Sequence, residues 1–281
     1  MSDATYLSHP QTRARIIKPP TEVSTYPIQD MIRDVDLPNH DARLLARSPN
    51  GRKKLVMHQR WESLLFLHWR VSPELIQKTL PPGLTVDTYD SDAYLGITVF
   101  FMHNVRPVGL PALPWISDFQ ELNVRTYAFD KTGTPGVWFY SLDCNRTAAT
   151  LFARLFAGLP YFLADMKANR RDWIDYECRR LGSNQTARYR YRPAGPDHEA
   201  SLNSLEFFLL ERYYLFAYRR AAGTLFRGQV SHAPYRYHDV EVPQLSDIPA
   251  KLDGFRDLDE SPDHVCVADG LDVKIFAQEK V

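Results

Sequence analysis

The chain has 281 residues, 44% of them hydrophobic and 24% charged, which is typical of a globular protein. Its 34 lysines and arginines equal its 34 aspartates and glutamates, so the sequence lacks the basic excess that a general nucleic-acid-binding protein carries. This length suits one large β-rich domain or two smaller domains.

Cysteine usage and hydropathy exclude several further classes. The three cysteines are far apart and form no CxxC or Cys/His cluster, so neither a disulfide scaffold nor a metal site is expected. No apolar run reaches the roughly 18 residues of a membrane helix, and the first residues lack the apolar segment of a secretory signal. No glycine-rich nucleotide loop, GxSxG elbow or HExxH motif occurs. We therefore expect a cytoplasmic protein that uses no cofactor and has neither a membrane nor a nucleic acid as its partner.

Residues 1–56 are predicted to form an N-terminal arm that is extended or partly disordered. They are polar, mixed in charge and rich in proline, with no sustained hydrophobic period, and one short helix is expected near residues 41–48. A single domain is expected over residues 57–281.

The rest of the chain alternates between β-prone runs and short turns. Helices are predicted at residues 73–80, with Ser72 as N-cap, and at residues 147–157 and 201–212. Residues 161–166 are predicted to be extended or partly helical. The predicted strands are residues 63–71, 84–89, 93–102, 118–129, 137–143, 173–180, 187–192, 213–219, 224–232, 264–268 and 271–277, the last two paired as a hairpin across Asp269-Gly270. This pattern predicts an α+β fold that is mainly antiparallel β, with a closed sheet.

Two of these strands carry informative patterns. Residues 93–102 (AYLGITVFFM) are mostly apolar, which predicts burial on both faces. Residues 118–129 (DFQELNVRTYAF) alternate, with Leu122, Val124 and Ala128 on one face. The opposite, polar face holds Glu121, Asn123, Arg125 and Tyr127. Such a row is either a solvated strand face or the polar wall of a cavity.

Several segments of the chain resemble, in order, the YqjF-like family, which carries only a domain-of-unknown-function label. They run from about Trp61 to Phe276 and therefore cover most of the chain. The segments are LHWRVSPELIQKTLPPGL, AYLGITVFFMHNVRP, FQELNVRTY, GVWFYSLDCN, LPYFLADM, SLEFFLLERY and HVCVADGLDV.

That family is similar to a remote branch of the acetoacetate decarboxylase-like superfamily. Arg70, followed by Pro81 and Leu84, resembles the arginine segment of the decarboxylases, and Glu121 resembles their glutamate. The resemblance implies a cone-shaped acetoacetate decarboxylase-like β-barrel with a few flanking helices. In those enzymes the arginine and glutamate lie beside a Schiff-base lysine.

The lysine pair of the decarboxylases is missing from this sequence. In the corresponding run, GLPYFLA at residues 158–164, Tyr161 and Phe162 occupy the lysine positions. Neither side chain can form an imine with a ketone, so the resemblance argues against the decarboxylase reaction. Lys167 is displaced by several residues and does not fill the role.

The resemblance and the residue chemistry together suggest a small-molecule site. The candidate residues are Glu121, His68 and Tyr161 for catalysis and Arg70, Asn123 and Arg125 for ligand binding. Glu121 would transfer a proton with the help of His68 or Tyr161. Arg70 would anchor an acidic or carbonyl group.

Each candidate also has an ordinary structural explanation. A polar strand face is most often solvated, and an exposed Glu–Arg pair contributes less than about 1 kcal/mol. Tyr161 fits core packing, and His68 and Arg70 fit a satisfied histidine and a surface arginine.

Three hypotheses therefore remain open. The first is an enzyme that acts on a carboxylate- or carbonyl-containing metabolite without a Schiff base. The second is a non-catalytic protein that binds a small anionic ligand in the same barrel. The third is a structural or partner-binding protein whose polar row is simply its exterior. Assembly into a homo-oligomer through exposed strands is compatible with all three.

Overall fold

Strands make up just over half of the residues that the computed structural model describes, which are residues 37–49, 53–113, 117–146 and 158–281. In chain order the elements are α2 (His40–Arg47), β1 (Leu55–Val71), α3 (Pro73–Gln77), β2 (Leu84–Val86), β3 (Ala93–Pro107), β4 (Phe119–Asp130), β5 (Pro135–Cys144), β6 (Tyr161–Arg170), β7 (Ile174–Arg180), β8 (Ala187–Glu199), α5 (Leu205–Leu210), β9 (Tyr214–Arg219), η1 (Arg220–Ala222), β10 (Thr224–Ser231), β11 (Arg236–Gln244), α6 (Ile248–Leu252), β12 (His264–Ala268), β13 (Leu271–Phe276) and β14 (Glu279–Lys280). Among the described residues no helix is long and apolar enough to cross a membrane.

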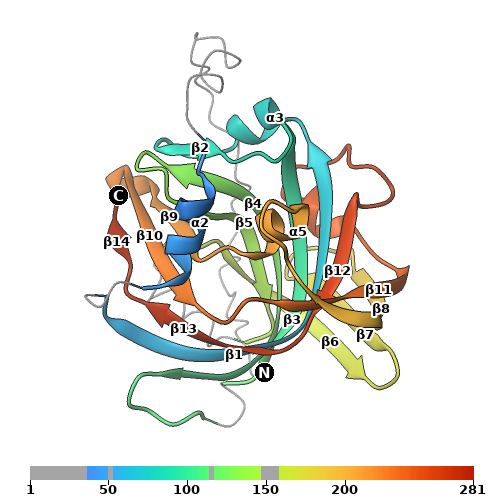
Figure 1. Cartoon of the computed structure of the whole chain (residues 1–281). Coiled ribbons are helices and arrows are strands. Elements are labelled where there is room, and N and C mark those ends of the chain that lie inside the picture. The colour runs from blue at the N-terminus through green and yellow to red at the C-terminus, as the bar shows by residue number, and fades with distance from the viewer. Residues whose placement is uncertain (1–36, 50–52, 114–116, 147–157) are drawn as a thin grey trace, which may run out of the picture.

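The strands form one 14-stranded sheet that is mainly antiparallel. The exceptions are β6 and β9, which both run parallel to β5. Besides its neighbours along the sheet, β12 also pairs with β1, and β5 also pairs with β4. Figure 1 shows the strands curving around a common interior. The α+β, mainly antiparallel prediction is therefore confirmed.

The predicted terminal hairpin is wrong. β12 and β13 do not pair with each other but follow one another along β1, with Leu64 opposite Ala268 and Trp61 opposite Leu271. Asp269-Gly270 thus separates two consecutive strands that both pair with β1, and it is not a hairpin turn. A Cβ on Gly270 would lie 2.9 Å from the Glu62 side chain, so glycine allows this close approach.

The other predicted elements differ from the observed ones mainly in length. The helix expected at 201–212 shrinks to α5, because Ser204 caps it by accepting a hydrogen bond from the Phe207 amide. The segment expected to be extended or partly helical is the strand β6. α2 and α3 form where helices were expected, and the helix predicted at 147–157 lies outside the described residues.

Both faces of the central strands are buried. β3 is buried over its first ten residues, as its apolar run predicts. In β4, Leu122 and Val124 belong to one hydrophobic cluster, whereas Phe119 and Tyr127 belong to another. The polar row of β4 is therefore turned toward the interior of the protein and not toward solvent.

Helix α5 closes one side of that interior. The Phe208 ring packs against Tyr94 of β3 and Tyr127 of β4, with ring centroids 6.0 and 5.5 Å apart. Four consecutive apolar residues of α5 are buried, which explains why such a short helix is stable. Arg212, two residues beyond the helix, is thereby brought next to β4.

Candidate functional site

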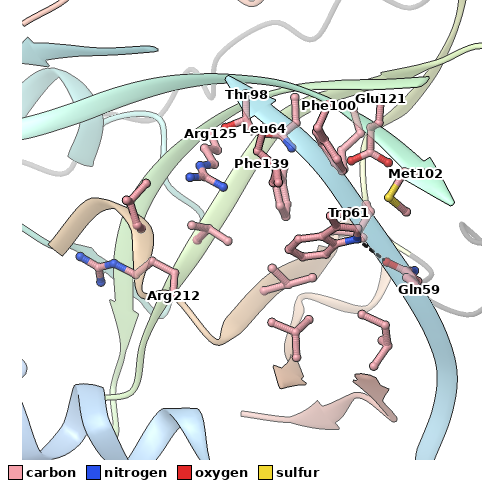
Figure 2. A pocket seen from close by; sticks show the side chains of 18 of the residues that line it. Gln59, Trp61, Leu64, Thr98, Phe100, Met102, Glu121, Arg125, Phe139 and Arg212 are labelled. Carbon is pink, nitrogen blue, oxygen red and sulfur yellow. Dashed lines mark hydrogen bonds between the residues drawn. The ribbon is translucent and has the colours of Figure 1, made fainter. Parts of the chain in front are cut away.

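A small cavity lies between β1, β3, β4, β5 and the segment that follows α5. Its volume is about 50 Å³, enough for a few non-hydrogen atoms. Most of its wall is apolar, including Trp61, Leu64, Phe100, Phe139, Leu142 and Leu159. Figure 2 shows the polar residues at its ends, with Arg125 and Arg212 on one side and Glu121 on the other.

The polar row of β4 supplies one wall of this cavity. Glu121, Asn123 and Arg125 line it, and Glu121 and Asn123 are each only 4% exposed. Tyr127, the fourth member of the row, is fully buried beside it. Period-two alternation holds along β4, so the same strand presents Leu122 and Val124 to the opposite cluster.

Glu121 forms a hydrogen-bonded pair with Tyr161. The Tyr161 hydroxyl donates to Glu121 Oε2 over 3.2 Å, from the first residue of β6. Burial raises the pKa of Glu121 to about 7, although hydrogen bonds from Tyr161 and Asn123 lower it in part. Burial also raises the pKa of Tyr161 well above its ordinary value, so the phenol keeps its proton. Glu121 can therefore take up or release a proton near neutral pH, whereas the Tyr161 hydroxyl stays a hydrogen-bond donor.

Arg125 is half-buried and has no acidic partner in the part of the chain that the structure describes. Its guanidinium lies over the Phe66 ring at 5.1 Å and donates a long hydrogen bond, 3.4 Å, to the Tyr127 hydroxyl. Its Nε atom has no hydrogen-bond partner among the described residues. A cation held against aromatic rings without a counter-ion is suited to an anionic ligand.

Arg212 is a second cavity arginine, and it is not among the candidate residues that the sequence suggested. It is 5% exposed, and its Nη1 donates to Asp87 over 2.5 Å. Its Nε donates to the Phe208 carbonyl, and its Nη2 has no partner among the described residues. The available signal was the pair of charged residues, Glu211 and Arg212, directly after the apolar run FFLL, but a local pattern cannot place Arg212 next to β4.

Four lining residues carry buried polar atoms that lack a hydrogen-bond partner in the described structure. They are Thr98 Oγ1, Asn123 Oδ1, Arg125 Nε and Arg212 Nη2. Buried polar atoms in folded proteins are nearly always paired, because each unpaired one costs about 1–3 kcal/mol. Their concentration around one cavity indicates that a polar molecule, water or a ligand, completes the site.

The structure does not bring Arg70 to this cavity. Its side chain is 57% exposed and pairs with Asp263 at 2.9 Å and Asp92 at 3.6 Å. Arg70 shares a strand face with the cavity residue Leu64, but six residues of strand separate them by roughly 20 Å. Arg70 therefore lies on the strand face that leads to the cavity, but at the end of β1 that is far from it.

His68 is close to the site without lining it. It is fully buried, and its two ring nitrogens contact the Tyr127 hydroxyl at 2.7 Å and His264 Nδ1 at 3.0 Å. Burial lowers the pKa of His68 well below its ordinary value, and His264 and Arg125 lower it further. The Tyr127 hydroxyl thus lies between His68 and the cavity residue Arg125.

No lysine lines the cavity among the described residues. Tyr161 faces Glu121, whereas the Phe162 ring packs under the Arg180 guanidinium at 4.4 Å, and Lys167 is exposed. An imine with a bound ketone has no amine from which to form at this wall. Within the described ranges no group of three or more His, Cys, Asp or Glu side chains is arranged to hold a metal ion.

Comparison with known proteins gives both a family and a fold. The family model DUF2071, described as "Uncharacterized conserved protein (COG2071)", matches residues 58–272. The chain is 37% identical over 189 residues to "Uncharacterized protein YqjF" of Bacillus subtilis (strain 168), which covers 66% of this chain and 77% of that protein.

Solved structures with a similar fold are remote in sequence. An acetoacetate decarboxylase-like enzyme from Sphingomonas wittichii RW1 has a TM-score of 0.57 at 14% identity, covering 83% of this chain and 96% of that one. The enduracididine biosynthesis enzyme MppR, in complex with the condensation product of pyruvate and imidazole 4-carboxaldehyde, has a TM-score of 0.56 at 12% identity, covering 81% and 89%. Acetoacetate decarboxylase from Legionella pneumophila has a TM-score of 0.53 at 14% identity, covering 93% and 98%. The resemblance drawn from the sequence is confirmed at the level of family and fold.

Proposed function

The chain belongs to the DUF2071 family, and we propose that its cavity binds a small metabolite with a carboxylate or carbonyl group and acts on it by proton transfer. No Schiff-base lysine takes part. Arg125 and Arg212 replace Arg70 as the anchoring arginines, and Glu121 with Tyr161 forms the proton-transfer pair.

The observation that carries this proposal is the excess of buried positive charge. Arg212 shares the single carboxylate of Asp87 with Arg43, and Arg125 has no acidic partner among the described residues. Glu121 does not offset this excess fully, because its pKa of about 7 leaves it partly protonated. Uncompensated buried charge is costly, so a bound anion would stabilise the site.

The proposed chemistry follows from the two ends of the cavity. The arginine end would hold the carboxylate, and Asn123 would hold a neighbouring polar group. Glu121 would then take or give a proton at the carbon next to a carbonyl group, while the Tyr161 hydroxyl donates to the carbonyl oxygen. His68 would position Arg125 through Tyr127 rather than touch the ligand. MppR, one of the proteins with this fold, has been solved with pyruvate, which makes pyruvate a reasonable probe.

Non-catalytic binding of the same ligand class is the second candidate. It is favoured by the phenol at Tyr161, where the decarboxylases carry a lysine, and by the small size of the cavity.

We also infer a closed, cone-shaped barrel, supported by the β12–β1 and β5–β4 pairings. A cytoplasmic location is supported by three buried free cysteines.

The first test is the binding of pyruvate and acetoacetate, measured by calorimetry on the native protein and on Arg125→Gln. Loss of a charged hydrogen bond costs about 1.5–3 kcal/mol, so we expect Arg125→Gln to bind roughly 10- to 100-fold more weakly. Arg70→Gln is the matched control, because it removes an exposed arginine far from the cavity, and its affinity should be unchanged. Equal affinity of all three proteins, or no binding of either acid, would contradict the proposal.

The same proteins separate an enzyme from a binder. Proton transfer next to a carbonyl exchanges the methyl protons of pyruvate for deuterium in heavy water, which proton NMR measures directly. We expect catalysed exchange by the native protein and its loss in Glu121→Gln, with binding retained. Binding without exchange in the native protein would favour the non-catalytic candidate.

A further inference from the structure

A row of basic and polar side chains crosses four neighbouring strands on the face of the sheet opposite the cavity. Ser231 of β10 is paired with Lys274 of β13, Lys274 with His58 of β1, and His58 with Arg106 of β3. Residues directly paired in a sheet lie on the same face, with about 4.8 Å between strands. The row therefore places two permanent cations and one imidazole within roughly 10 Å.

These side chains line a surface groove of about 550 Å³, within the usual size range of ligand sites. Arg106 and Lys274 form no salt bridge in the part of the chain that the structure describes. Among the described residues that line the groove, the one acidic residue is Asp272, which is 84% exposed and lies 3.5 Å from Arg60. The groove is therefore positive on balance.

A partition of side chains lies between this groove and the cavity. Gln59 lines both, and its Oε1 accepts a hydrogen bond of 2.8 Å from Trp61 Nε1, an interaction visible in Figure 2. His232 lies on the groove side, and its ring is 6.1 Å from Trp61 and 4.8 Å from Tyr235, both of which line the cavity. Gln59, Trp61 and His232 together form the partition.

His232 itself indicates a polar occupant at the inner end of the groove. It is 7% exposed, and its Nδ1 contacts the Ala233 carbonyl at 2.7 Å. Because a carbonyl can only accept, Nδ1 carries the proton, and Nε2 is an acceptor that has no partner among the described residues. An unpaired buried acceptor calls for a water molecule or a ligand hydroxyl.

We propose that this groove is the docking and entry site through which a small carboxylate reaches the cavity, with the Gln59–Trp61–His232 partition as the barrier that it passes. The inference rests on the proposed function, because it takes the cavity to be the ligand site. A positive groove raises the local concentration of anions and their rate of entry.

A second groove borders the cavity at Phe139 and offers the competing route. Its walls are largely apolar and aromatic, and its charged residues are balanced, with Arg220 and Arg256 against Asp253 and Asp257. The described residues of this second groove therefore carry no net charge that would attract an anion. The basic groove is therefore the better entrance for a carboxylate.

The test uses a cysteine placed inside the cavity, Thr98→Cys, and two alkylating reagents of similar size, iodoacetate and neutral iodoacetamide. Thr98 lines the cavity and is 1% exposed, and the change is nearly isosteric. The ratio of the two labelling rates, normalised to the same ratio at an exposed Leu181→Cys, reports the charge of the entry route. Val230 also lines the cavity, so Val230→Cys replaces Thr98→Cys if that variant does not fold. The native protein measures the background labelling of the three buried native cysteines.

We expect the normalised ratio to favour iodoacetate and to fall about 3- to 10-fold when Arg106→Gln and Lys274→Gln are added. Arg220→Gln with Arg256→Gln is the matched control in the second groove and should leave the ratio unchanged. The proposal is overturned if the cavity cysteine is not labelled, if the first pair has no effect, or if the control pair lowers the ratio. Because labelling needs no pyruvate binding, this failure is distinct from a failure of the proposed function.

Discussion

At the scale of single residues, the protonation of Glu121 is the most informative property of the site. Its carboxyl is 4% exposed, and burial raises its pKa to about 7 despite the hydrogen bond from Tyr161. Near neutral pH the residue is thus both a usable acid and a usable base. An ordinary surface glutamate would be fully ionised there and could not donate a proton.

This raised pKa makes a prediction about stability. The unfolded chain releases the Glu121 proton near pH 4.5, whereas the folded chain keeps it up to about pH 7. Between these values the folded state binds one more proton, so its stability falls as pH rises and then levels off above pH 7. The loss approaches about 3 kcal/mol at most.

Urea unfolding of native protein and Glu121→Gln at about pH 5 and about pH 8 measures this effect. We expect the variant to gain stability relative to the native protein at the higher pH, because glutamine cannot ionise. Glu177→Gln, an exposed acid on β7 paired with Arg188, is the control. Parallel pH profiles for native protein and Glu121→Gln would show that Glu121 is not buried as described.

At the scale of elements, β5 is a crowded strand that pairs with three others. It pairs with β4 on one side and, in parallel, with β6 and β9 on the other. Near its start, a Cβ on Gly136 would lie 2.6 Å from the Tyr214 backbone carbonyl and 2.8 Å from the Phe216 ring. Glycine is therefore needed where β5 and β9 come together.

Gly136→Ala should destabilise the protein by about 1–3 kcal/mol, because the new methyl group meets backbone rather than a side chain that can move. Gly133→Asn is the control, since Gly133 has open space around it and a φ of +75°, which asparagine tolerates. Denaturant midpoints measure both changes. Equal midpoints for Gly136→Ala and the native protein would contradict the close approach of the two strands.

The sequence predicted well those elements whose signal is local. The period of β4 correctly grouped Glu121, Asn123 and Arg125 on one face, and the apolar run of β3 correctly predicted burial on both faces. The prediction of a terminal hairpin was wrong because Asp269-Gly270 is a common hairpin-turn sequence. In the structure β1 is long enough to pair with β12 and β13 one after the other, and a local pattern does not contain that information.

At the scale of the whole molecule, the features that sequence could not predict are those built from distant segments. Arg70 was chosen as anchor by resemblance, but position along β1 rather than strand face keeps it out of the cavity. Arg212 enters the site because α5 packs on β3 and β4, a contact that no local pattern contains. Fold class and family were therefore accessible from sequence, whereas the complete set of cavity residues was not.

One buried cluster holds these distant segments together. Asp87, which follows β2, accepts two hydrogen bonds from Arg43 of α2, at 2.8 and 2.9 Å, and one from Arg212, at 2.5 Å. Asp87 is completely buried, and both arginines are at most 8% exposed. One carboxylate thus joins α2, the end of β2 and the segment after α5.

This sharing predicts an asymmetry between two substitutions. Asp87→Asn would leave two buried guanidinium groups without a counter-ion and should cost about 3–5 kcal/mol. Arg43→Met would leave a one-to-one Asp87–Arg212 pair and keep an apolar stem near Phe208, which Arg43 now covers at 5.1 Å, so it should cost less than half as much. Urea midpoints compare the two variants directly. Similar losses would mean that the cluster does not act as one charged unit, and the excess positive charge inferred for the cavity would lose its basis.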